Sequence, residues 1–400
     1  MKLASRISKI ETSKTIQVKE KALQLKAQGY DVIDLTAGEP DFNTPAFVRA
    51  AGVKAIEEGF TRYTANTGIP ELRDAIARKL KSDNNLDYTP EQIIVSNGAK
   101  QAILNTLMAL VEEGDEVLLP LPYWVSYPEQ IKIAGAKPVF IDTRESNFKV
   151  TPELIDKHLT PRTRALILNS PSNPTGVVLT PDEIRNLAEI LMKHKIWIIS
   201  DEIYEKIIFD GLKHVSIATF GDLIERTIVI NGFSKSFAMT GWRIGYAAGP
   251  LPVVKAMSKI QSHYTSNASS ISQKAALAAI NGPQDEIEKM RVTFEQRRNY
   301  IRNRLNSRPY FNYVNPQGAF YFFIKVSEAY GYRKNDVIID NSINFCTFLT
   351  ENSYLVGVPG AAFGADDYIR LSFAASQSEL EKGMDRLIET MDKMVESKNN

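Results

Sequence analysis

The 400-residue sequence has few of the features that mark several common protein classes. Its single cysteine, Cys346, excludes an intramolecular disulfide and a cysteine-based zinc cluster, and it suits a reducing compartment. The formal net charge of +1 gives no indication of a nucleic acid or an anionic membrane as a partner. No uninterrupted apolar stretch is long enough to span a bilayer, and residues 1–6 lack the apolar core of a signal peptide. We therefore expect a cytoplasmic protein that binds neither nucleic acid nor a membrane.

Histidine is scarce as well. The four histidines are scattered without the spacing of metal ligands, so we expect structural or surface roles for them and no bound metal. They are His158, His194, His214 and His263.

The content of 44% hydrophobic and 24% charged residues is ordinary for a globular protein, and the length allows two domains. Between about residues 90 and 250, short apolar runs typical of β-strands alternate with patterns typical of helices. The predicted strands are 93–95, 117–119, 138–142, 164–169, 196–199, 227–230 and 243–248. This alternation predicts an α/β fold, with a mostly parallel sheet and helices on both faces.

A predicted charged helix over residues 285–305 follows the Gly282-Pro283 break and marks a change of organisation. We predict a large domain over residues 46–283. A smaller α+β domain would combine residues 1–45 with residues 284–400, so that both chain ends contribute to it.

Residues 231–246 contain the most informative stretch, which reads Asn-Gly-Phe-Ser-Lys-Ser-Phe-Ala-Met-Thr-Gly-Trp-Arg-Ile-Gly-Tyr. Lys235 follows the apolar run 227–230 and is surrounded by glycine, serine and phenylalanine. Burial would lower the pKa of this lysine, and a neutral amine attacks carbonyl groups. Arg243 is a second cation that would lower this pKa further and could bind a phosphate. The structural alternative is a buried lysine paired with a carboxylate.

This stretch resembles the lysine signature of the class I aminotransferases, which belong to the fold-type I group of pyridoxal-phosphate enzymes. The resemblance runs from about Thr36 to Ser372, with the motifs in the family's order. It implies a fold-type I architecture and attachment of pyridoxal 5'-phosphate to Lys235. Ser234 and Arg243 are then cofactor-binding residues, and Lys235 moves the α-proton of the substrate in a ping-pong reaction.

Four further segments match the cofactor side of this family. Gly98 and Ala99 lie between the predicted strand 93–95 and a helix predicted over residues 102–111, where backbone N–H groups suit a phosphate. An acid at a strand end, such as Asp201, is often only a helix N-cap. The resemblance instead implies that it keeps the cofactor ring nitrogen protonated. It also implies contacts of Asn173 and Tyr204 with the phenolic oxygen, and stacking of Trp124 on the ring.

The substrate side is implied in the same way. Gly38, in the loop 36–42, and Arg370, in the predicted strand 368–373, would bind the substrate α-carboxylate, the arginine as a planar fork. Trp124 and Asn173 also belong to the substrate site. Tyr63 would reach the cofactor phosphate of a partner subunit, which implies a homodimer with shared active sites.

The expected substrates are inferred from Lys100. In the bacterial aspartate aminotransferase subgroup that the chain resembles, a lysine just after the phosphate-loop glycine binds the distal carboxylate. A solvated lysine at a helix start is the alternative for Lys100. We expect amino-group transfer between aspartate or glutamate and 2-oxo acids such as 2-oxoglutarate and oxaloacetate.

Several alternatives stay open. An aspartate/glutamate-prephenate aminotransferase would use the same residues, and an aminotransferase for aromatic or neutral amino acids or a lyase would share the cofactor machinery. A non-catalytic protein on the same fold, such as a regulator, is less favoured because the sequence keeps the lysine, aspartate, asparagine, tyrosine and both arginines.

Overall fold

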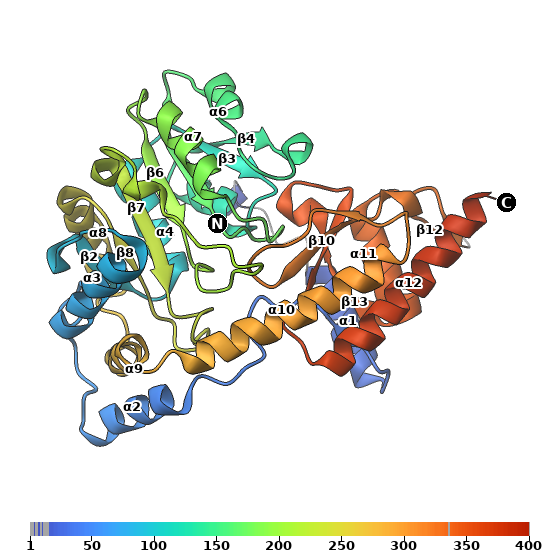
Figure 1. Ribbon diagram of the computed structural model, residues 1–400, viewed down its shortest axis with the longest axis horizontal. Coiled ribbons are helices and arrows are strands. Elements are labelled where there is room, and N and C mark those ends of the chain that lie inside the picture. The colour runs from blue at the N-terminus through green and yellow to red at the C-terminus, as the bar shows by residue number, and fades with distance from the viewer. Residues whose placement is uncertain (1–3, 5–6, 9, 11–15, 335–336, 400) are drawn as a thin grey trace.

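The computed structural model describes residues 4, 7–8, 10, 16–334 and 337–399. It combines a seven-stranded sheet enclosed by helices with a smaller four-stranded sheet, and the two lie side by side in Figure 1. The parts of the small-domain prediction that fall on residues 1–3, 5–6, 9, 11–15, 335–336 and 400 lie outside the described residues. The proposed division at residues 45/46 and 283/284 stays a prediction.

The large sheet is mostly parallel, as predicted. Its strands, in spatial order, are β2 (Ile93–Ser96), β8 (Gly245–Ala248), β7 (Thr227–Gly232), β6 (Trp197–Asp201), β5 (Thr163–Asn169), β3 (Glu116–Leu121) and β4 (Lys137–Asp142). Only β8 runs against its neighbours, β2 and β7. All other neighbours pair in parallel. The carboxyl ends of β2, β7, β6, β5, β3 and β4 therefore meet at one edge, where open α/β sheets bind ligands.

Alternating residues of these strands pack against helices on opposite faces. In β6, Ile199 belongs to a core with α4 (Ala99–Leu110), α5 (Ser126–Ile133) and α8 (Leu251–Tyr264). Its neighbour Ile198 belongs to a core with α6 (Pro152–His158) and α7 (Pro181–Leu191). On that side of β7, Val229 packs in a core with α2 (Ala46–Glu57), α3 (Pro70–Asn84) and α9 (Ser270–Asn281). The sheet is thus buried on both faces, which explains its near-continuous apolar strands.

The smaller sheet is antiparallel. Its strands, in order, are β14 (Val358–Pro359), β15 (Tyr368–Ser372), β10 (Tyr321–Lys325) and β9 (Asn312–Tyr313). Two short pairs complete the strands, β1 (Ile33–Asp34) with β13 (Leu355–Val356), and β11 (Arg333–Lys334) with β12 (Val337–Ile338). The surrounding helices are α1 (Ile16–Ala27), α10 (Asp285–Asn306), α11 (Ser342–Ser353) and α12 (Gln377–Asn399).

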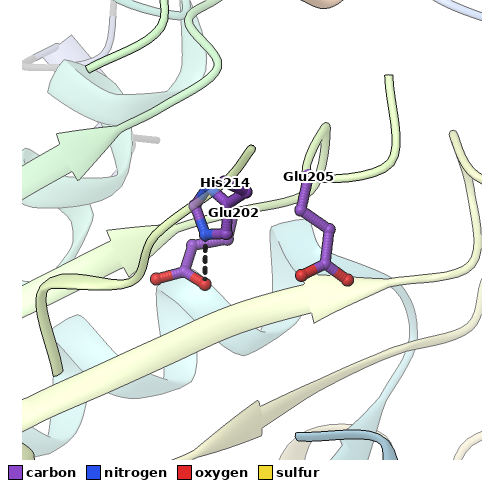
Figure 2. Close-up of side chains that lie close together, drawn as sticks. All are labelled: Glu202, Glu205 and His214. Atoms are coloured by element: carbon purple, nitrogen blue, oxygen red, sulfur yellow. Dashed lines mark hydrogen bonds and ion pairs between the residues drawn. The ribbon is translucent and has the colours of Figure 1, made fainter. Parts of the chain in front are cut away.

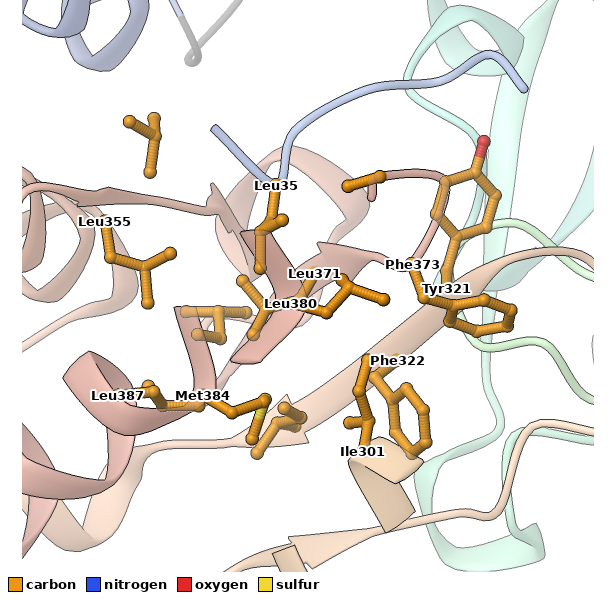
Figure 3. Packing of buried hydrophobic residues seen from close by; sticks show 14 of the residues in the cluster. Leu35, Ile301, Tyr321, Phe322, Leu355, Leu371, Phe373, Leu380, Met384 and Leu387 are labelled. Carbon is orange, nitrogen blue, oxygen red and sulfur yellow. The ribbon is translucent and has the colours of Figure 1, made fainter. Parts of the chain in front are cut away.

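The core beside this sheet joins the two ends of the chain. Figure 3 shows Leu35, from the segment after β1, next to Leu371 of β15 and Leu380 of α12. The parallel β1–β13 pair adds backbone hydrogen bonds to this contact. Burial of aliphatic side chains from both ends therefore positions the loop after β1, which carries Gly38.

The structure corrects several predicted boundaries. The helix expected over residues 102–111 begins three residues earlier, because Gly98 already ends the preceding turn with a positive φ of 82°. The strand expected over 243–248 begins at Gly245, since Arg243 has a left-handed backbone. The sequence pattern of residues 354–360 predicts one strand-like piece, whereas the structure forms two short strands there, β13 and β14. The helices α3, α5, α6 and α11 were not predicted.

Among the described residues from 16 onward, six short 3-10 helices connect the larger elements: Pro90–Gln92, Arg144–Ser146, Ile217–Thr219, Leu223–Arg226, Ser327–Ala329 and Gly360–Phe363. In the part of the chain that the structure describes, no helix has the length and apolar character needed to cross a membrane.

Candidate active site

A cavity of about 530 Å³ opens at the carboxyl edge of the large sheet and is bounded on the other side by the small sheet. Eleven of the thirteen predicted site residues line it. They are Gly38, Ala99, Lys100, Trp124, Asn173, Asp201, Tyr204, Ser234, Lys235, Arg243 and Arg370. The other two do not line the cavity: Gly98 is the residue before the lining residue Ala99, and Tyr63 lies outside the lining.

Lys235 lies three residues beyond β7, half-buried in the cavity wall. Its ammonium donates a hydrogen bond to the carbonyl oxygen of Gly38, from the loop after β1. Burial lowers the pKa of Lys235 to about 8, because desolvation and the charges of Arg370 and Arg243 outweigh the opposing charge of Glu39. This amine therefore loses its proton more readily than a surface lysine does.

Asp201 is the last residue of β6 and is almost fully buried. One carboxylate oxygen accepts a hydrogen bond from the Tyr127 hydroxyl at 2.6 Å, and the other accepts one from the backbone N–H of Ile203 at 3.2 Å. Burial raises the pKa of Asp201 to about 6 despite these two donors. Among the described residues no cation forms an ion pair with it, so a positive group bound in the cavity would stabilise its charged form.

Arg370 enters the cavity from the middle of β15 and is buried. Its Nη1 donates to Oδ1 of Asn173 at 2.9 Å, and its Nη2 donates to the carbonyl of Thr36 at 2.9 Å. Its Nε has no hydrogen-bond partner among the described residues. Burial lowers the pKa of this guanidinium. Because no carboxylate of the described chain pairs with Arg370, its charge is available to an anionic ligand.

Gly98, Ala99 and Arg243 form a second anion-binding arrangement. Gly98 caps the N-terminus of α4, whose first N–H groups have no partner within the helix. A Cβ atom at Gly98 would lie 2.9 Å from Nη2 of Arg243, so the guanidinium lies directly against this glycine. Arg243 is itself held by a 2.9 Å hydrogen bond to the carbonyl of Thr240, and Ser234 is buried nearby in the same lining.

Lys100, the second residue of α4, lies beside Trp124. Its Nζ is 4.9 Å from the centre of the indole ring. Although Lys100 is exposed, desolvation by the cavity wall and the charge of Arg243 lower the pKa of its ammonium. No carboxylate within the described ranges forms an ion pair with it, so this cation too is open to a ligand.

Tyr63 is the one predicted site residue that neither lines the cavity nor adjoins a lining residue in the sequence. Its side chain is 89% exposed and does not line the cavity. Its predicted contact with a second copy of the chain stays a prediction.

The cavity also contains residues that sequence reasoning missed. They include Thr36, Glu39, Tyr127, Asn169 and Tyr321. Tyr127 lies in the stretch 122–128, in which Trp124 is the one predicted site residue. Tyr321 lies in an aromatic run that reads as the buried interior of a strand. No sequence signal marks its hydroxyl, which lies 2.9 Å from the hydroxyl of Tyr204.

A cluster of Glu202, Glu205 and His214 lies outside this lining, with ligand atoms within 4.8 Å of one another (Figure 2). Glu202 accepts hydrogen bonds from Ser200 and Ser216 at 2.8 and 2.6 Å, and its other oxygen lies 2.8 Å from Nε2 of His214. Glu205 accepts from the Lys79 ammonium and the Asn84 amide. Both carboxylates thus accept hydrogen bonds from neighbouring side chains, as in a buried polar network.

A protein-family model described as aminotransferase class I and II matches residues 30–387. An aspartate aminotransferase of Geobacillus stearothermophilus is 50% identical over 392 residues, which cover 97% of this chain and 98% of the relative. The chain belongs to the class I and II aminotransferase family. Membership implies pyridoxal 5'-phosphate as the cofactor, and amino acids and 2-oxo acids as the substrates.

Two further comparisons, one with a relative and one with a solved structure, also match almost the whole chain. An aspartate/prephenate aminotransferase of Nitrosomonas europaea is 45% identical, covering 97% of this chain and 99% of the relative. The crystal structure of an aspartate aminotransferase from Rhizobium meliloti matches with a TM-score of 0.94 and 42% identity, covering 98% of this chain and 99% of the other. The predicted fold-type I architecture is therefore confirmed.

The residues of the cavity fit the family's cofactor. Asp201 is a buried carboxylate that forms no ion pair with a cation of the described residues, which suits a protonated ring nitrogen. The Gly98–Ala99 turn and Arg243 together suit a phosphate. Lys235 supplies an amine of lowered pKa within the same cavity.

Proposed function

We propose that the protein transfers an amino group between aspartate or glutamate and 2-oxo acids, with pyridoxal 5'-phosphate held at Lys235. The observation that carries this proposal is one cavity that contains the Lys235 amine together with two cations, Arg370 and Lys100, that lack carboxylate partners in the described chain. Substrates with two carboxylates would satisfy both cations.

The cofactor would be held by residues from several elements. Asp201 would hold a proton on the ring nitrogen, while Trp124 would stack on the ring. Asn173 and Tyr204 would contact the phenolic oxygen. The phosphate would be bound by a set made of Gly98, Ala99, Ser234, Arg243 and Tyr63 of a second copy. The bound cofactor supplies an electron sink for the carbanion that forms at the substrate α-carbon.

Arg370 and Lys235 would perform the remaining steps on the substrate. Arg370 would bind the α-carboxylate as a planar fork, in a position fixed by Asn173 and the carbonyl of Thr36. The neutral amine of Lys235 would take the α-proton and return it during the same half-reaction. A second 2-oxo acid would bind to the same groups and reverse these transfers.

The choice of a dicarboxylic substrate rests on Lys100, which would bind the distal carboxylate beside Trp124. The relatives described as aspartate aminotransferases support this choice. The relative described as an aspartate/prephenate aminotransferase supports prephenate as a second candidate acceptor, because it also carries two carboxylates.

A panel of donors tests the proposal. The purified, cofactor-loaded protein should transfer the amino group of aspartate to 2-oxoglutarate and of glutamate to oxaloacetate far faster than it uses alanine or phenylalanine. Prephenate as the acceptor measures the second candidate. Lys235→Ala is the control and should abolish turnover, and borohydride reduction should fix the cofactor on Lys235. Equal rates for all donors would refute the dicarboxylate preference, and labelling of another lysine would refute the assignment of Lys235.

A further inference from the structure

Tyr321 and Arg370 lie on one face of the small sheet. In the antiparallel pair of β10 and β15, Tyr321 is opposite Ser372, and Phe323 is opposite Arg370. Residues two apart on a strand point to the same side, so Tyr321 and Arg370 are diagonal neighbours, within reach of long side chains. The strand register therefore places an aromatic ring next to the buried guanidinium.

The ring and the hydroxyl of Tyr321 contact different residues. The ring centre lies 4.3 Å from Cζ of Arg370. The hydroxyl lies 2.9 Å from the hydroxyl of Tyr204. The side chain is completely buried, and Figure 3 shows the hydroxyl directed away from Phe322 and Phe373 in the neighbouring core. A single side chain thus contacts both the group proposed to bind the substrate carboxylate and the group proposed to contact the cofactor.

We propose that Tyr321 is a positioning residue, whose hydroxyl fixes the orientation of Tyr204 and whose ring fixes the guanidinium of Arg370. The inference rests on the proposed function of the cavity, and it adds a residue that touches neither substrate nor cofactor in that proposal.

Simple packing does not account for the hydroxyl. A phenylalanine would fill the same volume, whereas a buried hydroxyl is unfavourable unless it finds a hydrogen-bond partner. Its partner here is the Tyr204 hydroxyl. The pair leaves Tyr204 fewer orientations in which to present its remaining hydrogen-bonding capacity to the cavity.

The ring has a comparable role for Arg370. Only two of the guanidinium nitrogens have hydrogen-bond partners among the described residues, so these bonds alone leave the plane of the group free to tilt. The face of Tyr321 restrains this plane and gains a cation–π attraction. Phe363 lies 5.1 Å from the same Cζ and supplies a second, weaker ring contact. Loss of Tyr321 should therefore weaken the restraint without removing it.

Two substitutions separate the two parts. Tyr321→Phe removes the hydroxyl and keeps the ring, whereas Tyr321→Leu removes both. Tyr88→Phe is the matched control, because Tyr88 is a buried tyrosine outside the cavity whose hydroxyl has no hydrogen-bond partner among the described residues. Each variant is measured for kcat and KM with aspartate, for the pH titration of the cofactor absorption, and for binding of maleate, an unreactive dicarboxylate, by tryptophan fluorescence.

We expect Tyr321→Phe to lower kcat about 3- to 10-fold and to shift the absorption titration, with KM and maleate affinity within about twofold of the wild type. Tyr321→Leu should in addition weaken maleate binding and raise KM by about 5- to 30-fold. Tyr88→Phe should change none of these quantities. Tyr321→Met, which fills the space without a ring, replaces Tyr321→Leu if the leucine variant does not fold.

The possible failures can be told apart. If Tyr321→Phe matches the wild type in kcat and in the absorption titration, the role of the hydroxyl is refuted. If the leucine and methionine variants bind maleate as tightly as Tyr321→Phe does, the role of the ring is refuted. If the wild type transfers no amino group, the proposed function fails instead, and maleate binding still tests the contact between the ring and Arg370.

Discussion

The ammonium of Lys100 lies at the side of the cavity with an indole ring next to it and no carboxylate partner in the described chain. If it pairs with the distal carboxylate of the substrate, Lys100→Ala should lower kcat/KM for aspartate and glutamate by tens- to thousands-fold. Lys100 is exposed in the single chain. Once a bound substrate covers it, loss of one side of the buried charge pair would cost about 2–5 kcal/mol, which corresponds to this range. Alanine and phenylalanine never use the contact and should change little.

Steady-state kcat/KM for these four donors, in the wild type and in the variant, decides the role of Lys100. Losses of equal size across all four donors would mean that Lys100 supports the turn at Gly98 and that another group sets specificity. No change for any donor would mean that Lys100 is an ordinary solvated residue of the first turn of α4.

Asp201 should destabilise the protein when the cofactor is absent. Burial raises its pKa from 3.8 to about 6, so the unfolded chain holds the charged carboxylate more favourably than the folded chain does. Asp201→Asn should therefore stabilise the cofactor-free protein by about 1–3 kcal/mol above about pH 6, because a shift of about two pKa units corresponds to about 3 kcal/mol. This gain should disappear as the pH falls towards 3.8, where both states become protonated.

Urea unfolding of the cofactor-free wild type and variant at about pH 7.5 and about pH 4.5 measures this difference. Added cofactor should reverse the order, since the variant has lost the anion proposed to pair with the ring nitrogen. A variant that is less stable than the wild type at both pH values would show that the hydrogen bond from Tyr127 outweighs the cost of burying the charge.

At the scale of the elements, the site residues that the sequence predicted lie within contiguous motifs that directly follow strands. Asp201 ends β6, Asn173 follows β5, and Lys235 follows β7, so a single parallel sheet brings them to one edge. Tyr127 and Tyr321 could not be predicted in this way. Their partners, Asp201 and Tyr204, lie 74 and 117 residues away, and the contacts depend on strand register and helix placement that no local pattern contains.

The boundaries that were wrong have local causes of a similar kind. The helix α4 begins at Ala99 because Gly98 adopts a positive φ, which is a backbone choice that several turn geometries would have allowed. The helix α3, which was not predicted, is amphipathic, with Leu72, Ile76 and Leu80 buried on one side. Its packing against α9 stabilises it as a helix within the core.

The buried network around His214 predicts a pH-dependent stability. Burial by itself would lower the pKa of His214, but the charges of Glu202 and Glu205 and the 2.8 Å contact with Glu202 raise it above 6.5. Charged His214 thus stabilises the folded protein. This contribution is fully present below about pH 6.5 and is lost as the pH rises through the raised pKa of His214. We expect His214→Gln to be most destabilising near pH 6 and least destabilising near pH 9.

Free energies of unfolding at these two pH values test the direction of the effect. His263→Gln is the control, because His263 is exposed and its replacement should leave the pH profile close to that of the wild type. A larger loss at the alkaline end for His214→Gln would show that the neutral imidazole, rather than the charged one, stabilises the network.

At the scale of the whole molecule, several apolar and aromatic side chains lie exposed on the surface of the single chain. The helix α2 exposes Val53 and Ile56, and Tyr63, which follows it, is 89% exposed. Tyr264, at the end of α8, is a further exposed aromatic residue. Exposed apolar residues mark an interface between subunits where they gather in one contiguous patch. They support the proposed homodimer, in which Tyr63 of each copy would complete the phosphate site of the other.

Mixing two inactive variants tests this arrangement. In a hybrid of Lys235→Ala with Tyr63→Ala, one site receives both defects, and the other keeps its own Lys235 and the intact Tyr63 of the first chain. Random exchange of subunits in a two-fold symmetric dimer should then restore about a quarter of the wild-type activity. The activity of the mixture, measured against the sum of the separate variants and alongside ultracentrifugation, is the readout. A mixture no more active than that sum, or an active monomer, would show that each chain builds its site alone.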